Sequence, residues 1–547
     1  MLLLRKYVIV SILFVCSLVA PSLANDGASS TPNFVPNQTL MLKMRDGTAL
    51  PTDIYLPPDH SKKYPVILLR NPSGRKASPW IRYAGLAQAG FIVAFQDTRS
   101  VMDLEGKTMP YFADGWGELQ DGYDSVEALA KYEYSNGKVG TAGFSAPGVS
   151  QHMLAPTAPP SLQTQYIGVA APSLYHHAVY PGGCLQKSQV EGWLGQYAKD
   201  PSMNAIILKE KTYNDFWKNF NMLEVVDQVK TPALLYGGWY DIFLQGTIDA
   251  FIARQELGGE GARGKQKLLI GPWTHFWPQN IQLGDFEVPV AGRTTPWDMS
   301  PLAWFNYYLK NIPTGVEKAA PVTYYVMGPF DGTHSKGNIW KSANSWPVPA
   351  KSTPFYFAKE GKLQKESPAP ILETLSYTID PENPIPTTGG CNLFLEAGPK
   401  DQRPIEARTD VVHFTSEPLA EDLEVTGRLI AKIYHQPLPH DVDIMVRLTD
   451  VYPDGKSILI ADGVCHVPKN TPGIHAEAEA DEVDLWSTSM VFAKGHCLRV
   501  SVCGSNYPRY EKPNLPIKSV GVGSQFSMTL FTGGKAASHI MLPIVEN

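Results

Sequence analysis

The first half of the chain alternates short apolar runs with segments of helical character. The apolar runs span residues 64–70, 91–96, 139–143, 166–171, 233–237 and 267–271. Runs this short and almost wholly apolar are typical of parallel strands that are covered on both faces. Helical patterns at residues 81–89 and 119–132 separate the earlier runs, and a hairpin of residues 40–45 and 49–55 turns at Asp46-Gly47. The alternation predicts an α/β sheet.

Residues 173–229 break this rhythm. The segment is rich in Trp, Tyr, Gln and Lys, with helix-like pieces around residues 188–197 and 215–221. Because it interrupts the sheet between two strands, it is predicted to form a small helical cap over one edge of that sheet. Trp193 and Trp217 either line a pocket under this cap or belong to its core.

The second half of the chain changes from helical to extended periodicity. Residues 300–309 are predicted to be a helix because they begin with a serine N-cap and a proline and carry an apolar stripe. Residues 321–327 are extended, and every second residue is apolar across 442–448. Further short strands separated by Gly and Pro continue to residue 542, which predicts a β-sandwich.

These patterns divide the chain into four parts. We expect a signal peptide at residues 1–24, an α/β domain at residues 37–172 and 230–318, a helical cap at residues 173–229, and a β domain at residues 319–547.

The signal peptide is indicated by Arg5 and Lys6 before an apolar run and by the small residues Ser22 and Ala24. A retained membrane anchor is the alternative, although the apolar run is shorter than the ~20 residues of a spanning helix. Cleavage after Ala24 predicts an exported protein, secreted or periplasmic, with no membrane contact afterwards.

Composition narrows the possible partners. The 547 residues are 43% hydrophobic and 18% charged, as in an ordinary globular protein, and carry a net charge of -6. No basic block accompanies this charge, so nucleic acid is not an expected partner.

The cysteines favour small buried residues over a disulfide framework. Cys497 and Cys503 lie too far apart on one strand to reach each other, so the expected bridge, if one forms, joins Cys465 to one of them. No Cys/His spacing suggests a metal site, and no cofactor is expected. The oligomeric state is left open.

The stretch Gly143-Phe144-Ser145-Ala146-Pro147-Gly148 follows a predicted strand and opens a predicted helix. A serine needs a sharp turn and a neighbouring base to act as a nucleophile, and small residues on both sides make that turn possible. The spacing is G-x-S-x-x-G, which also occurs in ordinary loops. Its interpretation therefore depends on an acid and a base elsewhere.

Asp241 and His275 supply the acid and the base. Each follows the carboxyl end of a predicted strand, where open α/β sheets place their chemistry. The order Ser145, Asp241, His275 is the order of the α/β-hydrolase triad. Three such residues in this order favour a catalytic site over three structural residues.

Several motifs in this order resemble the cocaine-esterase and X-Pro dipeptidyl-peptidase-like serine hydrolases, the CocE/NonD type, a group that includes glutaryl-cephalosporin acylases. The motifs are residues 69–72 (LRNP), 96–99 (QDTR), 135–140 (SNGKVG), 238–241 (GWYD), 271–275 (GPWTH), 384–390 (PIPTTGG) and 401–404 (DQRP). The resemblance covers nearly the whole mature chain. It implies an α/β-hydrolase domain with a helical lid insertion, followed by a C-terminal jelly-roll β-sandwich.

Carried over to this chain, the resemblance implies that Ser145 is the nucleophile, His275 the general base and Asp241 the residue that orients it. The oxyanion hole would use the Ala146 N–H and a second donor at Ser73, where many members have a tyrosine. Since the serine hydroxyl is shorter, we expect a backbone N–H of Ser73 or Gly74 to be this donor.

The resemblance also suggests that Asp97 and Arg99 support the site as an ion pair. They stay outside the expected catalytic set, because a structural salt bridge is the commoner role of such a pair.

The sequence thus predicts a secreted serine hydrolase that cleaves an ester or amide through an acyl-enzyme. Its substrates would be small esters, amides or short peptides. An X-Pro dipeptidyl peptidase is one alternative; it would need a carboxylate for the substrate amine, for which Glu191, Asp200 and Glu210 are weak candidates. A catalytically weak carbohydrate- or peptide-binding protein is the alternative from another class.

Overall fold

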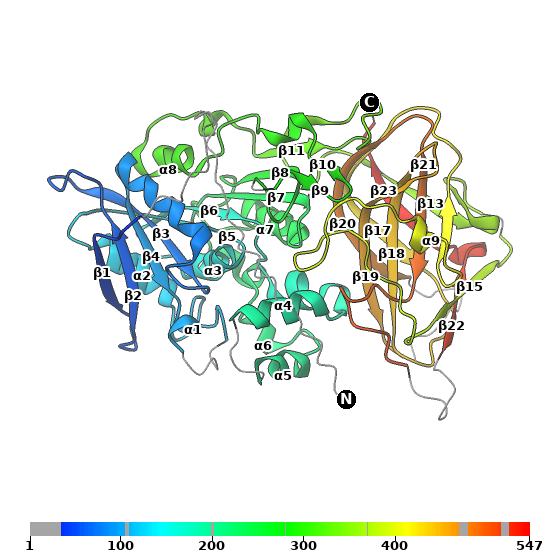
Figure 1. Cartoon of the computed structure of the whole chain (residues 1–547), viewed down its shortest axis with the longest axis horizontal. Coiled ribbons are helices and arrows are strands. Elements are labelled where there is room, and N and C mark those ends of the chain that lie inside the picture. Colours follow the sequence, from blue (N-terminus) through cyan, green and yellow to red (C-terminus); the bar gives the residue numbers. More distant parts are fainter. Residues whose placement is uncertain are drawn as a thin grey trace, which may run out of the picture.

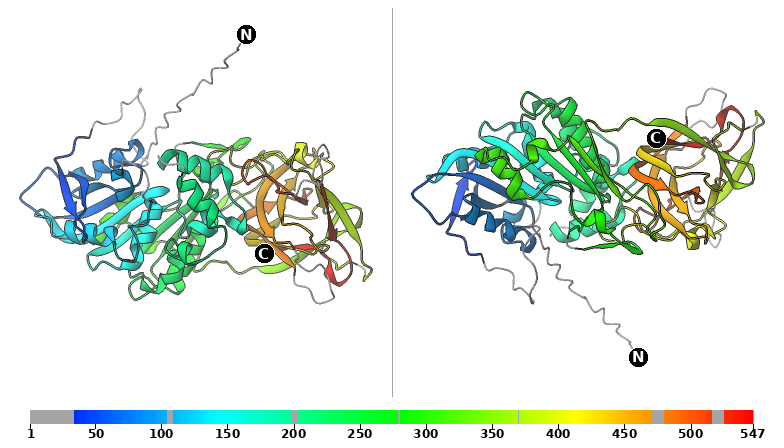
Figure 2. Two further views of the ribbon diagram at one scale, coloured as in Figure 1. Left: turned by 90° about the horizontal axis from the view of Figure 1, so that it is seen from below. Right: turned by 90° about the horizontal axis from the view of Figure 1, so that it is seen from above.

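The computed structural model describes residues 34–103, 109–197, 202–278, 280–368, 370–469, 480–515 and 525–546. Two bodies lie side by side along the long axis of the molecule, an α/β body and a β body, with a group of helices at the junction between them (Figures 1 and 2). The predicted signal peptide lies outside the described residues.

A ten-stranded mixed sheet forms the α/β body, in the order β1-β2-β4-β3-β5-β6-β7-β8-β11-β12. The strands are β1 (Gln38–Lys43), β2 (Ala49–Tyr55), β3 (Tyr64–Asn71), β4 (Ile92–Asp97), β5 (Ser135–Phe144), β6 (Leu162–Gly168), β7 (Ala233–Tyr240), β8 (Lys267–Thr274), β11 (Val322–Val326) and β12 (Ile339–Ala343). The pairs from β4 through β11 are parallel, whereas β1–β2, β2–β4 and β11–β12 are antiparallel. All eight strands expected from the apolar pattern, including the N-terminal hairpin, are therefore present.

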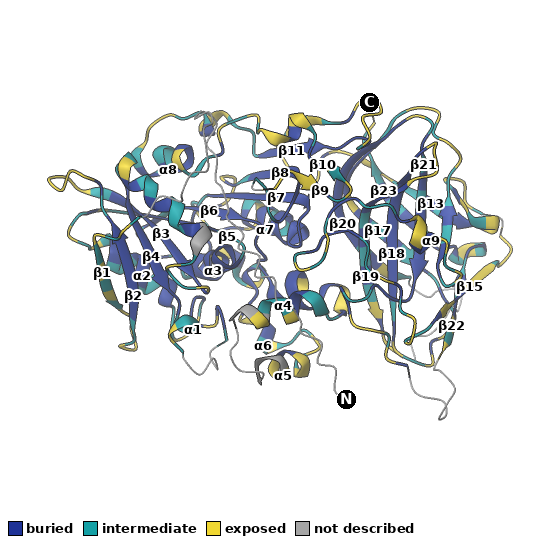
Figure 3. Cartoon of the chain, viewed as in Figure 1, coloured by how far each residue is buried: buried dark blue, intermediate teal, exposed yellow. Residues whose placement is uncertain are grey.

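The central strands of this sheet are covered on both faces, which explains why β3, β4, β7 and β8 are buried along almost their whole length. On β3, Leu68 belongs to a hydrophobic cluster that contains Leu129, whereas its neighbour Leu69 belongs to a second cluster that contains Phe305. Figure 3 shows the strands of the sheet buried beneath the helices. A parallel sheet buried in this way presents its functional side chains at the carboxyl ends of its strands.

The elements of this body outside the sheet are its helices and one short ribbon. They are η1 (Ser78–Ala89), α1 (Arg99–Met102), α2 (Asp121–Ala130), α3 (Ala146–Leu154), η2 (Ala155–Thr157), α7 (Leu244–Glu256), β9 (Gln282–Leu283), β10 (Phe286–Glu287), η6 (Val290–Arg293), α8 (Pro301–Lys310) and η7 (Val316–Lys318), where η denotes 3₁₀ and π-helical turns. The predicted helix cap at Ser300 is confirmed, since its side chain accepts a hydrogen bond from the N–H of Ala303.

The predicted cap between β6 and β7 is helical. Its elements are η3 (Tyr175–Val179), η4 (Pro181–Gly183), α4 (Lys187–Tyr197), α5 (Ser202–Lys209), α6 (Asp215–Lys218) and η5 (Met222–Gln228). The two tryptophans differ in role: Trp217 is fully buried in the core, whereas Trp193 is half-buried and stacks on Tyr111. Of the described residues, no helix is both long and apolar enough to cross a membrane.

The β body is built around one closed sheet of nine strands, in the order β13-β14-β16-β21-β18-β19-β20-β17-β23. Its strands are β13 (Lys351–Ala358), β14 (Lys362–Gln364), β16 (Val412–Thr415), β17 (Leu423–Ile433), β18 (Val442–Val451), β19 (Ser457–Val467), β20 (Asp481–Phe492), β21 (Cys497–Cys503) and β23 (His539–Ile544). A ribbon of β15 (Thr374–Ile379) and β22 (Phe526–Phe531), and the short helices η8 (Lys359–Gly361), α9 (Arg403–Glu406) and η9 (Gly534–Ala536), complete it.

Two features of the β body differ from the sequence prediction. Its strands pair into a closed sheet, where two separate sheets of a sandwich were expected. The first two strands after residue 318, β11 and β12, continue the α/β sheet, because β11 pairs in parallel with β8. Periodicity shows that a segment is extended but not which neighbour it pairs with.

The expected cysteine bridge is wrong. Cys184, Cys391, Cys465, Cys497 and Cys503 are all free thiols. Strand β18 lies between the strands of Cys465 and Cys503, so these two cysteines are two strand spacings apart, about 9.6 Å. A disulfide needs α-carbons within about 7 Å of each other.

Candidate active site

Ser145 sits in a sharp turn between strand β5 and helix α3. Its φ of 58° lies in the left-handed region, which is rare for a residue with a side chain. Close packing at the turn explains the flanking glycines. A β-carbon at Gly143 would lie 2.5 Å from Cβ of Pro147, and one at Gly148 would lie 2.6 Å from Cβ of Ala170. The turn therefore holds the serine hydroxyl at the carboxyl edge of the sheet, as the motif predicts.

Asp241 and His275 follow the neighbouring strands β7 and β8. Asp241 is fully buried, and its Oδ1 accepts a hydrogen bond of 2.7 Å from the N–H of Phe243. Its Oδ2 lies 2.6 Å from Nδ1 of His275. On the other side of the imidazole, Nε2 lies 3.0 Å from Oγ of Ser145. The structure thus brings together the three residues in the order expected from the sequence.

This chain of contacts is suited to moving a proton. A buried carboxylate at Nδ1 holds a proton on that nitrogen, which leaves Nε2 as an acceptor facing the serine hydroxyl. His275 is itself 6% exposed, so bulk water has little access to the pair. Both contacts lie within the range required of a nucleophile and its base.

The two predicted oxyanion donors have different surroundings. Ala146 is the first residue of α3, where the helix leaves the backbone N–H without an intrahelical acceptor. By contrast, the N–H of Ser73 donates to Oδ1 of Asn71, and the N–H of Gly74 donates to the backbone oxygen of Asn71. The turn after β3 thus already uses both backbone donors, so our expectation that one of them points at the oxyanion does not fit this arrangement.

A narrow cavity of about 60 Å³ opens in front of Ser145. It is lined by Tyr111, Ser145, Ala146, Val149, Leu174, Ala178, Val179, Gln189, Val190, Trp193, Phe243, Leu393 and Phe394. No charged side chain is among these described residues. The one amide, Gln189, is 5% exposed, and its Oε1 has no hydrogen-bond partner within the described part of the chain.

Three parts of the chain build this cavity, and sequence reasoning missed two of them. Leu393 and Phe394 come from the β body, and Phe394 packs on Gly192, where a β-carbon would lie 2.5 Å from its ring. Tyr111 comes from a turn before α2 and has a φ of 71°. A positive φ at a tyrosine cannot be read from the sequence.

The predicted ion pair between Asp97 and Arg99 is wrong. Asp97 pairs with Arg75, which also lies 3.1 Å from Asp53. Arg99 instead binds Asp121 and Asp46, at 2.6 Å and 2.7 Å. Asp97 is the last residue of β4 and Arg99 the first of α1, and these two positions serve separate salt bridges.

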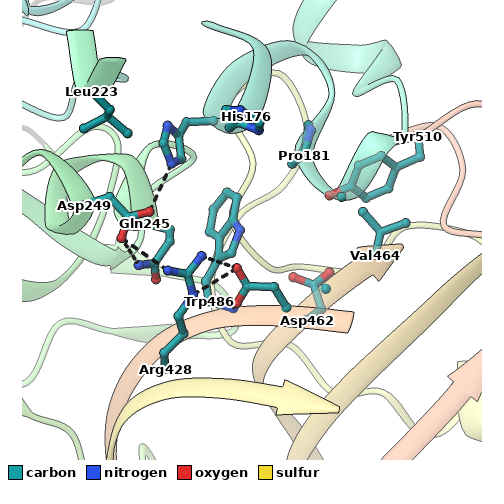
Figure 4. Close-up of a pocket in the computed structure, with 14 residues that line it drawn as sticks. His176, Pro181, Leu223, Gln245, Asp249, Arg428, Asp462, Val464, Trp486 and Tyr510 are labelled. Atoms are coloured by element: carbon teal, nitrogen blue, oxygen red, sulfur yellow. Dashed lines mark hydrogen bonds and ion pairs between the residues drawn. The ribbon is translucent and has the colours of Figure 1, made fainter. Parts of the chain in front are cut away.

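A second and larger cavity, of about 330 Å³, lies where the cap and helix α7 meet the β body (Figure 4). Ion pairs run along its wall, from His177 of η3 to Asp249 of α7 at 3.2 Å, and from Asp249 to Arg428 of β17 at 3.4 Å. Arg428 also binds Asp484 of β20 at 2.6 Å. These ion pairs join the three parts of the chain, which favours a structural junction.

Comparison with known proteins shows the family to which the chain belongs. A family model described as X-Pro dipeptidyl-peptidase (S15 family) matches residues 46–206 and 191–277. The model of the X-Pro dipeptidyl-peptidase C-terminal non-catalytic domain matches residues 314–541. A cocaine esterase from Rhodococcus sp. (strain MB1 Bresler) is 26% identical over 94% of this chain and 99% of its own length.

Solved structures share the fold over nearly the whole chain. An aminopeptidase from a marine sediment archaeon, Thaumarchaeota archaeon, aligns with a TM-score of 0.77 at 21% identity, covering 96% of this chain and 100% of that chain. An α-amino acid ester hydrolase aligns with a TM-score of 0.75 at 21% identity, covering 97% and 100%. At these identities the likeness shows the fold alone.

The fold and the family matches define a serine hydrolase that acts on esters or amides. The chain belongs to the X-Pro dipeptidyl-peptidase (S15) family, CocE/NonD type.

Proposed function

We propose that this hydrolase acts through an acyl-enzyme formed on Ser145. His275 takes the hydroxyl proton as Oγ attacks the substrate carbonyl, and it gives that proton to the leaving group when the C–O or C–N bond breaks. Water then attacks the acyl ester by the same route, which releases the acid and restores the serine. Asp241 remains ionised and stabilises the imidazolium.

The hydrogen-bonded chain from Ser145 through His275 to Asp241 carries this proposal, with contacts of 3.0 Å and 2.6 Å. A fluorophosphonate probe tests it, because the probe reacts only with an activated serine. A catalytically weak binding protein would remain unlabelled at probe concentrations that label a serine hydrolase completely.

The lining of the cavity supports an apolar acyl group as the part of the substrate held beside Ser145. A free α-amine, as in an X-Pro dipeptide, would need a carboxylate at this depth, because an unpaired buried charge is costly. Glu191 is exposed and pairs with Lys187, and Glu210 accepts a hydrogen bond from Asn214. Neither lines the cavity, and Asp200 lies outside the described residues.

We therefore expect esters with apolar acyl groups to be preferred to X-Pro anilides. The mature protein should show a kcat/KM at least about 100-fold higher on p-nitrophenyl esters of such acids. A preference for X-Pro anilides would contradict the assignment.

The variant Gln189→Glu tests whether a carboxylate is the missing group for substrates with a free amine, since it adds one with no change in side-chain length. It should shift the preference towards substrates with a free amine by about 10-fold. A mutation to Leu at the same position removes the polar group and should produce no such shift.

The oxyanion hole gives a further prediction at Ser73. Because the nearby backbone donors are already used by Asn71, Ser73→Tyr should raise kcat on activated esters, by up to about 100-fold, by supplying a longer donor. The mutation Ser73→Ala should leave kcat unchanged, because the side chain is exposed and does not line the described cavity. A large loss in Ser73→Ala would instead show that the serine hydroxyl is the donor.

Export completes the proposed function. The charged start, the apolar run and the small residues before Ala24 support a cleaved signal peptide and a secreted or periplasmic enzyme. The N-terminal sequence of the protein recovered outside the cytoplasm should begin after Ala24.

A further inference from the structure

A glycine pair brings one cap cysteine against the β body. Gly182 and Gly183, both in the turn of η4, have φ values of 60° and 80°. A β-carbon at Gly182 would lie 1.9 Å from the backbone oxygen of Val464 on β19. Only glycine allows this approach, and it places the next residue, Cys184, over the neighbouring strands.

At this position Cys184 lies beside a carboxylate and an imidazole. Asp443 on β18 and His466 on β19 are directly opposite each other in the antiparallel pair, and Nδ1 of His466 lies 2.8 Å from Oδ1 of Asp443. The thiol of Cys184, the carboxylate and the imidazole offer ligand atoms that all lie within 4.8 Å of one another. Sequence spacing could not reveal this cluster, because its members are far apart along the chain.

One side of the cluster is buried and the other is open to solvent. Cys184 is 3% exposed, whereas the side chain of His466 is 39% exposed. Burial raises the pKa of the Cys184 thiol, and the neighbouring Asp443 raises it further. The hydrogen bond to Asp443 raises the pKa of His466. A thiol and a carboxylate placed side by side disfavour each other's anionic form, and a bound cation would relieve this repulsion.

We propose that Cys184, Asp443 and His466 bind a divalent transition-metal ion, with Zn²⁺ the best match to the three donors. Thiolate, imidazole and carboxylate are the ligands that zinc takes in proteins. Bond lengths of about 2.0–2.3 Å in a tetrahedral site place ligand atoms roughly 3.3–3.6 Å apart. Nδ1 of His466 and Oδ1 of Asp443, now 2.8 Å apart, would separate by about 0.5 Å, and the other ligand atoms would approach by no more than about 1.5 Å to reach that geometry.

Protons and charge balance when the ion binds. Cys184 releases its proton to solvent and binds as a thiolate, His466 binds as a neutral imidazole, and one Asp443 oxygen binds as a carboxylate. Water fills the fourth position on the exposed side, next to His466. The ion neutralises both anionic ligands, so the complex carries no net charge.

Such an ion would join the cap to the β body. Cys184 follows η3 and η4, and Ala178 and Val179 of η3 line the cavity in front of Ser145. The metal would therefore hold one wall of that cavity at a fixed distance from strands β18 and β19. The binding itself is independent of turnover, so its test needs no substrate.

The test uses Co²⁺ as a spectroscopic probe on the chelator-treated full chain. One equivalent should give a thiolate-to-cobalt charge-transfer absorption together with the intense visible bands of a four-coordinate ion. Excess Zn²⁺ should remove both. Absence of the charge-transfer band at stoichiometric Co²⁺ would overturn the proposal.

Variants identify the ligands. Cys184→Ser should abolish the charge-transfer absorption, and His466→Gln, at a partly exposed position, should weaken Co²⁺ binding by at least about 10-fold even if the first variant folds poorly. Cys465→Ser is the matched control, because this thiol neighbours His466 in sequence but is not among the three ligands. A band that persists in Cys184→Ser, or that disappears in Cys465→Ser, would overturn the assignment.

Discussion

Ser145→Ala is expected to reduce ester turnover by about 10⁶-fold and to remove labelling by a fluorophosphonate. In the proposed mechanism the hydroxyl oxygen forms the acyl-enzyme, and this variant removes the oxygen that lies 3.0 Å from Nε2 of His275. Alanine keeps the small β-carbon that the turn at this φ already accommodates. The fold and the thermal stability should therefore be preserved, which circular dichroism and melting curves would check.

Ser150→Ala gives the matched control for this result. Ser150 lies on the same helix, α3, is 2% exposed, and its hydroxyl has no hydrogen-bond partner among the described residues. This variant should keep both turnover and labelling. If Ser145→Ala retained labelling at the native rate, the nucleophile would be a different serine and the assignment would be wrong.

The three residues of this site could be picked out from the sequence because each is marked by the residues next to it. Ser145, Asp241 and His275 each follow an apolar run, and parallel strands buried on both faces bring their carboxyl ends to one edge. The glycines at 143 and 148 mark a tight turn in any fold that contains it. Chain order and strand ends therefore predicted that the three side chains converge at one edge, where the structure places them within hydrogen-bonding distance.

Features that depend on contacts between distant parts of the chain could not be predicted in this way. The choice of Arg75 as the partner of Asp97 depends on where the turn after β3 runs. Phe394 reaches the cavity in front of Ser145 only because the β body docks against the cap. Likewise, the periodicity of the sequence does not show that a strand lies between Cys465 and Cys503, so the predicted disulfide bridge was wrong.

Asp241→Asn should reduce kcat by about 10⁴-fold with little effect on the fold. The reason lies in how the carboxylate is held. Its Oδ1 accepts the N–H of Phe243 at 2.7 Å, and an asparagine would keep that bond with its carbonyl oxygen. The amide NH₂ would then face Nδ1 of His275, at the position where Oδ2 lies 2.6 Å away in the native protein.

A hydrogen-bond donor at this position reverses the tautomer of the His275 imidazole. With an NH₂ group facing it, Nδ1 must accept a hydrogen bond, so the ring proton moves to Nε2 and points at Ser145. The imidazole can then no longer take the serine proton, although every heavy atom stays in place. Stopped-flow acylation with an activated ester should show the loss in the acylation step itself.

Asp249→Asn separates this effect from the general loss of a carboxylate that contacts a histidine. Asp249 also contacts a histidine, with its Oδ2 at 3.2 Å from Nε2 of His177, but it lies in the second cavity, away from Ser145. This variant should weaken the junction with the β body while acylation stays close to the native rate. If Asp241→Asn and Asp249→Asn slowed acylation equally, the contact between Asp241 and His275 would be structural, and the tautomer argument would fail.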